Sequence, residues 1–496
     1  MGPNSSVQFD LKTHATDFVP DALAADALRR LIHQQDEELK DLDDEIEQLT
    51  ARLYALEDQR AEIAKSHRLH RAFLAPIRKL APEILGEVFI QCLLASRDDW
   101  PAYDVRLLLL RVCQRWKRIA IGTPGLWTFL RLEFAPQISV QMCLDNAGCL
   151  PIHVHLVDHS YVGSAEIPLL LDNFHRVQEI EGYCSPLMQG ILHRGLVLQT
   201  PLLRMVHLAG DRFWRHNIEL ENIIQPPPIE SLELIDCADL LSIFCRKPGK
   251  LQHLKVEEES HVDMYTPALL DILPFSSSLR SLDLLLPSEM TVISEDVWRS
   301  TLPHLHSLSI LGQLNHICQL LAALDVPSLD CLTLCTGLLR ADATLADGIL
   351  WNPIQSLLQG NPPPLRYLTL EHISLGHGFV DFVSRLSHLE YLRLDMCHMT
   401  SEHLGAFILS HIPYHNMVCP RLATLSFNEV TLPGDVLIQV VQSRVPLHGI
   451  PGENRCLRTV KAWCGGLIDH YVALEDIREA CSGQLTLDLG PWSCCV

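Results

Sequence analysis

A short pattern of leucines, LxxLxL, recurs along the part of this 496-residue chain that follows Gly148. Successive copies begin 22 to 36 residues apart. Several of these intervals lie within the range of about 20 to 29 residues that is typical of leucine-rich repeats, and the longer ones indicate inserted loops or helices. The copies begin at Leu203, Ile229, Leu251, Leu279, Leu305, Leu329, Leu365, Leu389 and Leu422, and a degenerate copy begins at Leu457.

The alternation inside each copy predicts a short strand with one buried face, because successive side chains of a strand point to opposite sides. One such unit cannot bury its apolar edge alone, whereas about ten stacked units form a continuous core. We therefore expect an irregular α/β leucine-rich-repeat-like solenoid over residues 201–496. An ordinary α/β domain with leucine-rich strands is the alternative.

The polar residue between the last two apolar residues of each copy is expected on the open, concave face of such a sheet. Tyr367 and Tyr391 lie two positions before such residues, so they belong to the same face. The mixture of charges selects no particular ligand. The polar residues expected there are His207, Glu233, Lys255, Asp283, Ser309, Thr333, Thr369, Arg393, Ser426 and Lys461.

Residues 23–75 carry a seven-residue apolar repeat, which is typical of a coiled-coil helix. The a positions are Ala25, Ile32, Leu39, Ile46 and Leu53, and the d positions are Leu28, Leu42, Leu49, Leu56 and Ile63. Gln35, Arg60 and His67 interrupt the two series. The repeat predicts one of two arrangements. Either the helix pairs with another chain, which could be a second copy in a homodimer, or it folds against its own domain.

Charge, apolar runs and cysteine spacing limit the classes of partner and the cellular compartment that can be expected. The formal net charge is −21, so the average field repels a phosphate backbone and no nucleic acid is expected. No apolar run approaches the roughly 18 residues of a membrane span, and residues 1–22, expected to be flexible, lack a secretory pattern. The 17 cysteines form no metal-type CxxC pair. We expect a protein of the cytoplasm, the nucleus or both, with no membrane partner.

The sequence holds no familiar catalytic or cofactor signature, such as GxGxxG, GxxxxGK[ST], GxSxG or HExxH. His153 and His155 would share one face of a strand, which suits a metal, but their spacing fixes no third ligand. A surface strand is the favoured interpretation. We therefore predict no enzyme, no cofactor and no metal site.

Two amphipathic helices are expected between residues 76 and 130. Pro82 suits the first position of a helix, and the following apolar residues form one broad stripe. Asp104 can cap a second helix that ends at Gly122. So small a module has a small core, which makes Trp116 and Trp127 candidates for contact with an external partner.

The stretches "LAPEILGEVFIQCL" and "LLLLRVCQRWKRIAIGTPGLW" resemble an F-box. The matching positions are the start L-x-P-E-I-L, Val112-Cys113, Trp116 and Leu126-Trp127, whereas Ala81 and Gln114 depart from the usual pattern. The acidic heptads before this segment and the irregular leucine repeats after it are similar to a group of F-box proteins expanded in fungi.

This resemblance implies a substrate receptor of a Skp-cullin-F-box ubiquitin ligase. The box would bind the Skp-type adaptor of the cullin complex, and the repeats would hold an unknown protein substrate. The implied adaptor-binding residues are Leu80, Pro82, Ile84, Leu85, Val88, Phe89, Val112, Cys113 and Trp116. The substrate-binding residues expected on the open face are His207, Glu233, Lys255, Asp283, Tyr367, Tyr391 and Arg393.

The expected fold class is thus α+β, with a coiled-coil helix at 23–75, an F-box at 76–130, a linking region with the first strands at 131–200, and the solenoid. Some of the implied adaptor contacts must instead hold the box together, and the sequence does not separate them. A non-ligase scaffold that uses the coiled coil and the repeats for protein binding is the alternative function.

Overall fold

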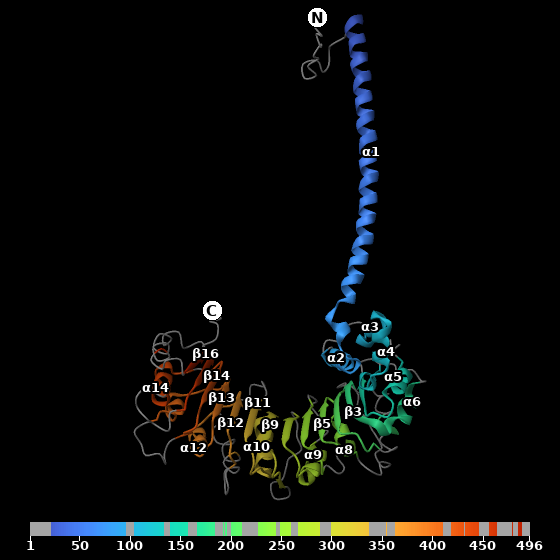
Figure 1. Cartoon of the computed structure of the whole chain (residues 1–496). Helices are drawn as coiled ribbons and strands as arrows, with labels where there is room; N and C mark the ends of the chain where they lie inside the picture. Colours follow the sequence, from blue (N-terminus) through green and yellow to red (C-terminus); the bar gives the residue numbers. More distant parts are fainter. Residues whose placement is uncertain are drawn as a thin grey trace. The chain divides into compact units, whose positions relative to one another are not determined.

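A computed structural model gives the fold as a mixture of helices and strands that divides into two compact units, residues 1–87 and 88–496 (Figure 1). Of residues 1–22, which were expected to be flexible, 1–20 lie outside the described part, whereas Asp21 and Ala22 form the start of the first helix. The structure describes residues 21–95, 104–132, 139–156, 166–183, 200–210, 227–244, 249–258, 266–287, 299–336, 363–409, 418–430, 432–445, 456–463 and 485–488, with a few isolated positions between them.

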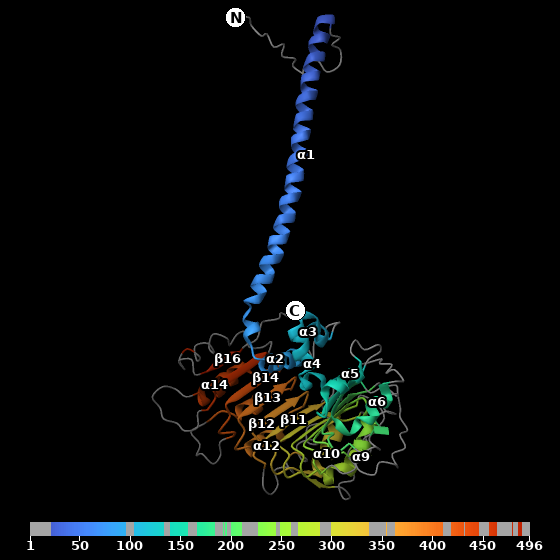
Figure 2. The same cartoon turned by 45° about the vertical axis from the view of Figure 1, so that its right-hand side comes forward.

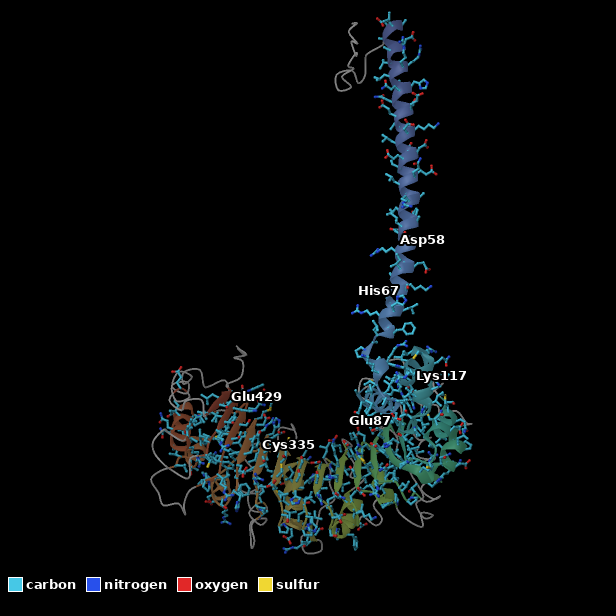
Figure 3. The ribbon with its side chains drawn as sticks, in the orientation of Figure 1. Asp58, His67, Glu87, Lys117, Cys335 and Glu429 are labelled. Atoms are coloured by element: carbon cyan, nitrogen blue, oxygen red, sulfur yellow. The ribbon has the colours of Figure 1, made fainter. Side chains whose placement is uncertain are left out.

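The first unit is dominated by one long helix, α1 (Ala22–Phe73). The carboxylate of Asp21 caps it by accepting a hydrogen bond from the backbone N–H of Ala24 at 2.8 Å. No residue of α1 is buried, and Figure 3 shows its side chains projecting on all sides. The long N-terminal helix predicted from the heptads is confirmed. A short 3-10 helix, η1 (Pro76–Lys79), follows it.

Short helices precede and flank the first strands. α2 (Pro82–Ala95) begins at the proline that the sequence indicated. Asp104 caps α3 (Val105–Val112) as predicted, but the second helix is interrupted at Cys113, whose extended backbone separates α3 from α4 (Gln114–Ile121). The remaining short helices of this part are η2 (Pro124–Trp127), α5 (Val140–Ala147), α6 (Glu166–Asp172) and η3 (Phe174–Arg176).

The second unit is built on a sheet in which the described strands run parallel and follow one another in chain order (Figure 2). Its strands are β1 (Phe129–Leu132), β2 (Ile152–Leu156), β3 (Val177–Tyr183), β4 (Met205–Ala209), β5 (Ser231–Ile235), β6 (His253–Glu257), β7 (Ser281–Leu285), β9 (Ser307–Gly312), β11 (Cys331–Thr336), β12 (Tyr367–Glu371), β13 (Tyr391–Asp395), β14 (Thr424–Asn428), β15 (Thr459–Trp463) and β16 (Thr486–Asp488). β8 (Ser300–Thr301) and β10 (Leu324–Asp325) form a separate parallel pair. The sheet thus begins well before residue 201.

Helices follow many of these strands, and α9, α10 and α12 lie along one side of the sheet (Figures 1 and 2). Their apolar residues are buried, as with Ile317 and Leu321 of α10 and Phe379 of α12. The helices are η4 (Ala238–Leu240), α8 (Leu241–Phe244), α9 (Thr266–Ile272), η5 (Leu273–Phe275), α10 (Leu314–Ala323), α12 (Gly378–Ser384), α13 (Ser401–Gly405) and α14 (Gly434–Arg444).

The core lies under the leucines of the repeated pattern. The first apolar residue of every copy, from Leu203 to Leu457, is buried, and so are the two apolar residues of each strand, such as Leu232 and Leu234. After several strands the next residue turns the chain with a positive φ, as Asp236 does at 52°. Its N–H then donates to the Glu257 carbonyl of the neighbouring strand, so the same hydrogen-bonded turn spaces successive strands.

Candidate protein-binding surfaces

One continuous row of side chains crosses the face of the sheet opposite to the buried leucines. Strand register places each member directly beside the next, and we call this the central row. The predicted polar positions all belong to it, which confirms the alternation inferred from the pattern. The central row is Arg131, His155, Glu181, His207, Glu233, Lys255, Asp283, Ser309, Thr333, Thr369, Arg393, Ser426, Lys461 and Asp488.

The first half of the central row is a chain of opposite charges. Lys255 Nζ lies 2.7 Å from Glu233 Oε1 and 3.2 Å from Glu257 Oε1, and His207 Nδ1 lies 3.7 Å from Glu233 Oε2. The hydrogen bond with Glu233 raises the pKa of Lys255. Burial raises the pKa of Asp283 against a hydrogen bond from Ser281. These charges are largely compensated before any partner arrives.

An aromatic pair and a second group of ion-paired side chains lie along the second half of the central row. The rings of Tyr367 and Tyr391 lie side by side with centroids 6.1 Å apart, and Tyr367 is 39% exposed. Arg393 donates to Asp395 at 2.7 Å, and the Asn428 amide donates to the same carboxylate at 2.8 Å. Hydroxyl residues of the central row separate this group from the first. The two tyrosines therefore form an aromatic patch on this face.

The apolar stripe of α2 divides into two rows. Leu85, Phe89 and Leu93 are buried, whereas Ile84, Val88 and Cys92, each one position earlier, are exposed. Residues four apart lie on one side of a helix, so the exposed row is a continuous apolar strip along α2. Just before it, Leu80 is half-buried and Pro82 is exposed.

The predicted residues of α3 and α4 also divide. Val112 and Cys113 are exposed, with Val112 at 56%, and Leu108 lies one turn before Val112 with 54% exposed. Trp116 is half-buried, and its ring packs against Phe89 with centroids 4.9 Å apart.

Trp127 is fully buried, so the prediction that it contacts an external partner is wrong. Its indole Nε1–H donates to the Ala120 carbonyl at 2.7 Å, which satisfies a backbone acceptor near the end of α4. The guanidinium of Arg106, also buried, lies 5.8 Å from the Trp127 ring centroid and donates to the Phe129 carbonyl. Trp127 thus belongs to the core between α4 and β1.

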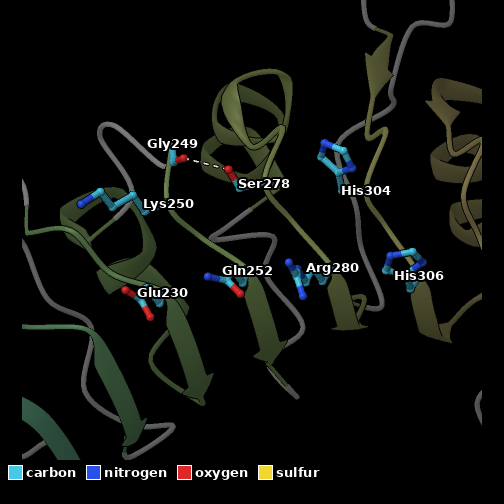
Figure 4. Close-up of a pocket in the computed structure, with 8 residues that line it drawn as sticks. All are labelled: Glu230, Gly249, Lys250, Gln252, Ser278, Arg280, His304 and His306. Carbon is cyan, nitrogen blue, oxygen red and sulfur yellow. Dashed lines mark hydrogen bonds between the residues drawn. The ribbon is translucent and has the colours of Figure 1, made fainter.

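A pocket of about 520 Å³ lies at the edge where β5, β6, β7 and β9 begin (Figure 4). Lys250, Arg280, His304 and His306 line it, and within the described residues neither Lys250 nor Arg280 forms an ion pair. The one carboxylate of the lining, Glu230, pairs with Arg204. The pocket can therefore accommodate an anionic group, which Lys250 and Arg280 could both contact.

Sequence reasoning did not single out this pocket, although a signal was present. Glu230, Gln252, Arg280 and His306 each occupy the second position of an LxxLxL copy. The backbone N–H groups at these positions bond to the preceding strand's equivalent position, as Arg280 does to Gln252, so the repeat stacks their side chains along one edge.

The two histidines considered for a metal lie on β2 and face carboxylates of β3. His153 Nδ1 pairs with Glu179, and His155 Nδ1 lies 3.0 Å from Glu181 Oε1. Within the ranges described above, no three His, Cys, Asp or Glu side chains gather in a way that could hold a metal ion. The same ranges contain no helix that is long and apolar enough to cross a membrane. Neither a protein-family model nor a curated protein matches the chain.

Proposed function

We propose that this protein is the substrate-recognition subunit of a Skp-cullin-F-box ubiquitin ligase. In this proposal residues 76–130 act as an F-box, the following repeats form a leucine-rich-repeat-like solenoid, and the protein positions a target without catalysing the transfer. The chain-order parallel sheet, in which the first apolar residue of all ten copies is buried, supports the solenoid. The residues of the F-box pattern support the adaptor role.

The observation that carries the proposal is the exposed apolar strip of α2. Ile84 belongs to the L-x-P-E-I-L start and is 55% exposed, although the adjacent Leu85 is fully buried. A helix needs one apolar row to pack against its own unit, whereas a second, exposed row has the composition of a protein-binding surface. Val112 of the V-C motif is exposed in the same way.

The target would lie on the open face of the sheet. Tyr367 and Tyr391 offer aromatic area of the kind that dominates binding energy in protein interfaces, and Arg393 lies beside them in the register. The internally paired charges of His207, Glu233 and Lys255 would add orientation more than affinity, because a partner gains little from charges that are already compensated.

Co-purification with a Skp-type adaptor and its cullin tests the adaptor role. We expect the full chain to recover the adaptor, and Ile84→Asp and Val112→Asp to lose most of it because each puts a charge on an apolar contact. Phe275→Asp is the control, since Phe275 is an apolar residue outside the motif and is more exposed still, at 70%. Failure of the wild-type chain to recover the adaptor, while a known F-box protein does, refutes the proposal.

The target face is tested separately, by affinity capture with the proteasome inhibited. Proteins that bind the face should be retained by Val112→Asp and lost together by Tyr391→Ala and Arg393→Glu. A captured set that is indifferent to both face substitutions would place target binding elsewhere on the chain.

A further inference from the structure

The long helix α1 leaves an apolar stripe uncovered. Its a and d residues from Ile32 to Ile63 are between 46% and 62% exposed, and no residue of the helix is buried. A stripe with a seven-residue period over this length is the pairing surface of a coiled coil. Such a surface is normally covered by a partner helix.

Two of the three polar interruptions of the stripe, Gln35 and Arg60, indicate the partner and its direction. In an antiparallel pair each a residue lies opposite a d residue of the other helix. One register places Gln35, at d, opposite Arg60, at a, of a second copy, so that the amide oxygen can accept a hydrogen bond from the guanidinium. The other layers between Ile32 and Ile63 are then all apolar: Ile32 with Ile63, Leu39 with Leu56, Leu42 with Leu53, and Ile46 with Leu49. At each end of the stripe His67 lies opposite Leu28.

We propose that α1 pairs antiparallel with α1 of a second copy of this chain in that register. The g positions nearest the centre of the pair agree, because Glu45 then lies beside Arg52 of the second copy, and the symmetry makes this ion pair twice. Nearer the ends, Asp36 and Glu57 at e positions lie beside each other and oppose the pairing. Residues 36–47, in which eight carboxylates outnumber the single Lys40, lie opposite residues 48–59 and not opposite themselves. This pairing does not depend on the proposed ligase role.

Two other pairings leave charges or polar groups mismatched. A parallel pair puts Arg60 against Arg60 in the core and Glu38 beside Asp43, both of which repel. An antiparallel pair shifted by one heptad puts Arg60 against Leu28 and Gln35 against Leu53, so each polar side chain meets an apolar one. The shifted pair would also place Glu38 beside Arg52.

Charge reversals at two equivalent g positions distinguish the three pairings. The full chain is studied by sedimentation equilibrium over a range of concentrations, with helix content followed by circular dichroism. We expect a wild-type dimer, and Glu45→Arg should raise its Kd about tenfold because two attractive pairs become repulsive. Combining Glu45→Arg with Arg52→Glu should restore the wild-type Kd.

Glu38→Arg is the matched control, since it makes the same change one heptad earlier. In the proposed register Glu38 faces Gln59, so its reversal should change Kd by less than about twofold. Tighter association of Glu38→Arg, with Glu45→Arg unchanged, would show a parallel pair, and weaker association of Glu38→Arg would show the shifted register. Either result, or a wild-type chain that stays monomeric, overturns the proposal.

Discussion

Ile84 and Leu85 are neighbours in sequence but differ sharply in burial, and this difference predicts opposite consequences of the same truncation. Leu85 is fully buried, so Leu85→Ala removes its contacts and leaves a cavity, at a cost of about 3 kcal/mol. Ile84 is 55% exposed, and Ile84→Ala should change the free energy of unfolding by less than about 0.5 kcal/mol. The adaptor contact, in contrast, should depend on Ile84.

Hydrogen exchange of the α2 amides measures the first effect locally, which suits a chain of two units that need not unfold in one step. A loss of about 3 kcal/mol corresponds to a rise of roughly 100-fold in the rate of exchange through opening. Leu85→Ala should show this rise in peptides that cover α2, and Ile84→Ala should keep the wild-type rates while recovering less adaptor. Equal acceleration in both variants would contradict the division of α2 into a buried and an exposed row.

Three further predictions concern stability, each followed by urea unfolding. Trp127→Phe removes the indole donor from the Ala120 carbonyl, which keeps the Thr123 N–H as a donor at 3.3 Å, and should cost about 1 kcal/mol; an unchanged midpoint would refute this contribution. Gly210→Ala places a Cβ 2.5 Å from the Asp236 carbonyl oxygen and should cost about 1 to 3 kcal/mol, whereas Gly405→Ala, with nothing within 4 Å, should be tolerated. Burial lowers the pKa of His403, so its contribution to the free energy of unfolding is complete above a pH of about 6.5 and is lost as the pH falls through the lower pKa of the folded state. His403→Gln should therefore lose less stability than the wild type as the pH falls, and the same dependence of stability on pH in both proteins would contradict this.

The repeated pattern allowed much of the sheet to be predicted because strand alternation is a local property. Successive side chains of a strand point to opposite faces of the sheet, so the apolar residues at alternate positions share the buried face. Leu368 and Leu392 are buried for this reason. The equal offset of each strand from its pattern then aligns Thr369 with Arg393 in the register. Local periodicity therefore predicted ten of the fourteen members of the central row, whereas Arg131, His155, Glu181 and Asp488 lie on strands outside the recognised copies.

The helical segment was predicted less completely because its details depend on packing between elements. Helical spacing indicated one apolar stripe on α2 but could not separate Leu85 from Ile84, which are adjacent and equally apolar. The break at Cys113 and the burial of Trp127 depend in the same way on how α3, α4 and β1 meet. From sequence alone a tryptophan can be either a contact residue for a partner or part of the core. Trp127 is part of the core because its indole N–H has an acceptor inside the fold.

The charges of the open face show why composition alone is a poor guide to what this protein binds. In the sequence Glu233 and Lys255 are separate exposed residues 22 positions apart, yet strand register brings them within 2.7 Å and makes them each other's partner. The central row as a whole carries four basic and four acidic side chains, so the formal charge of −21 overstates the negative field that a ligand meets there. The Tyr367–Tyr391 pair on the face and Arg280 at the edge pocket, which forms no ion pair with the residues that the structure describes, have more to gain from a partner. In the proposed receptor these positions, more than the paired charges, should determine which protein is held.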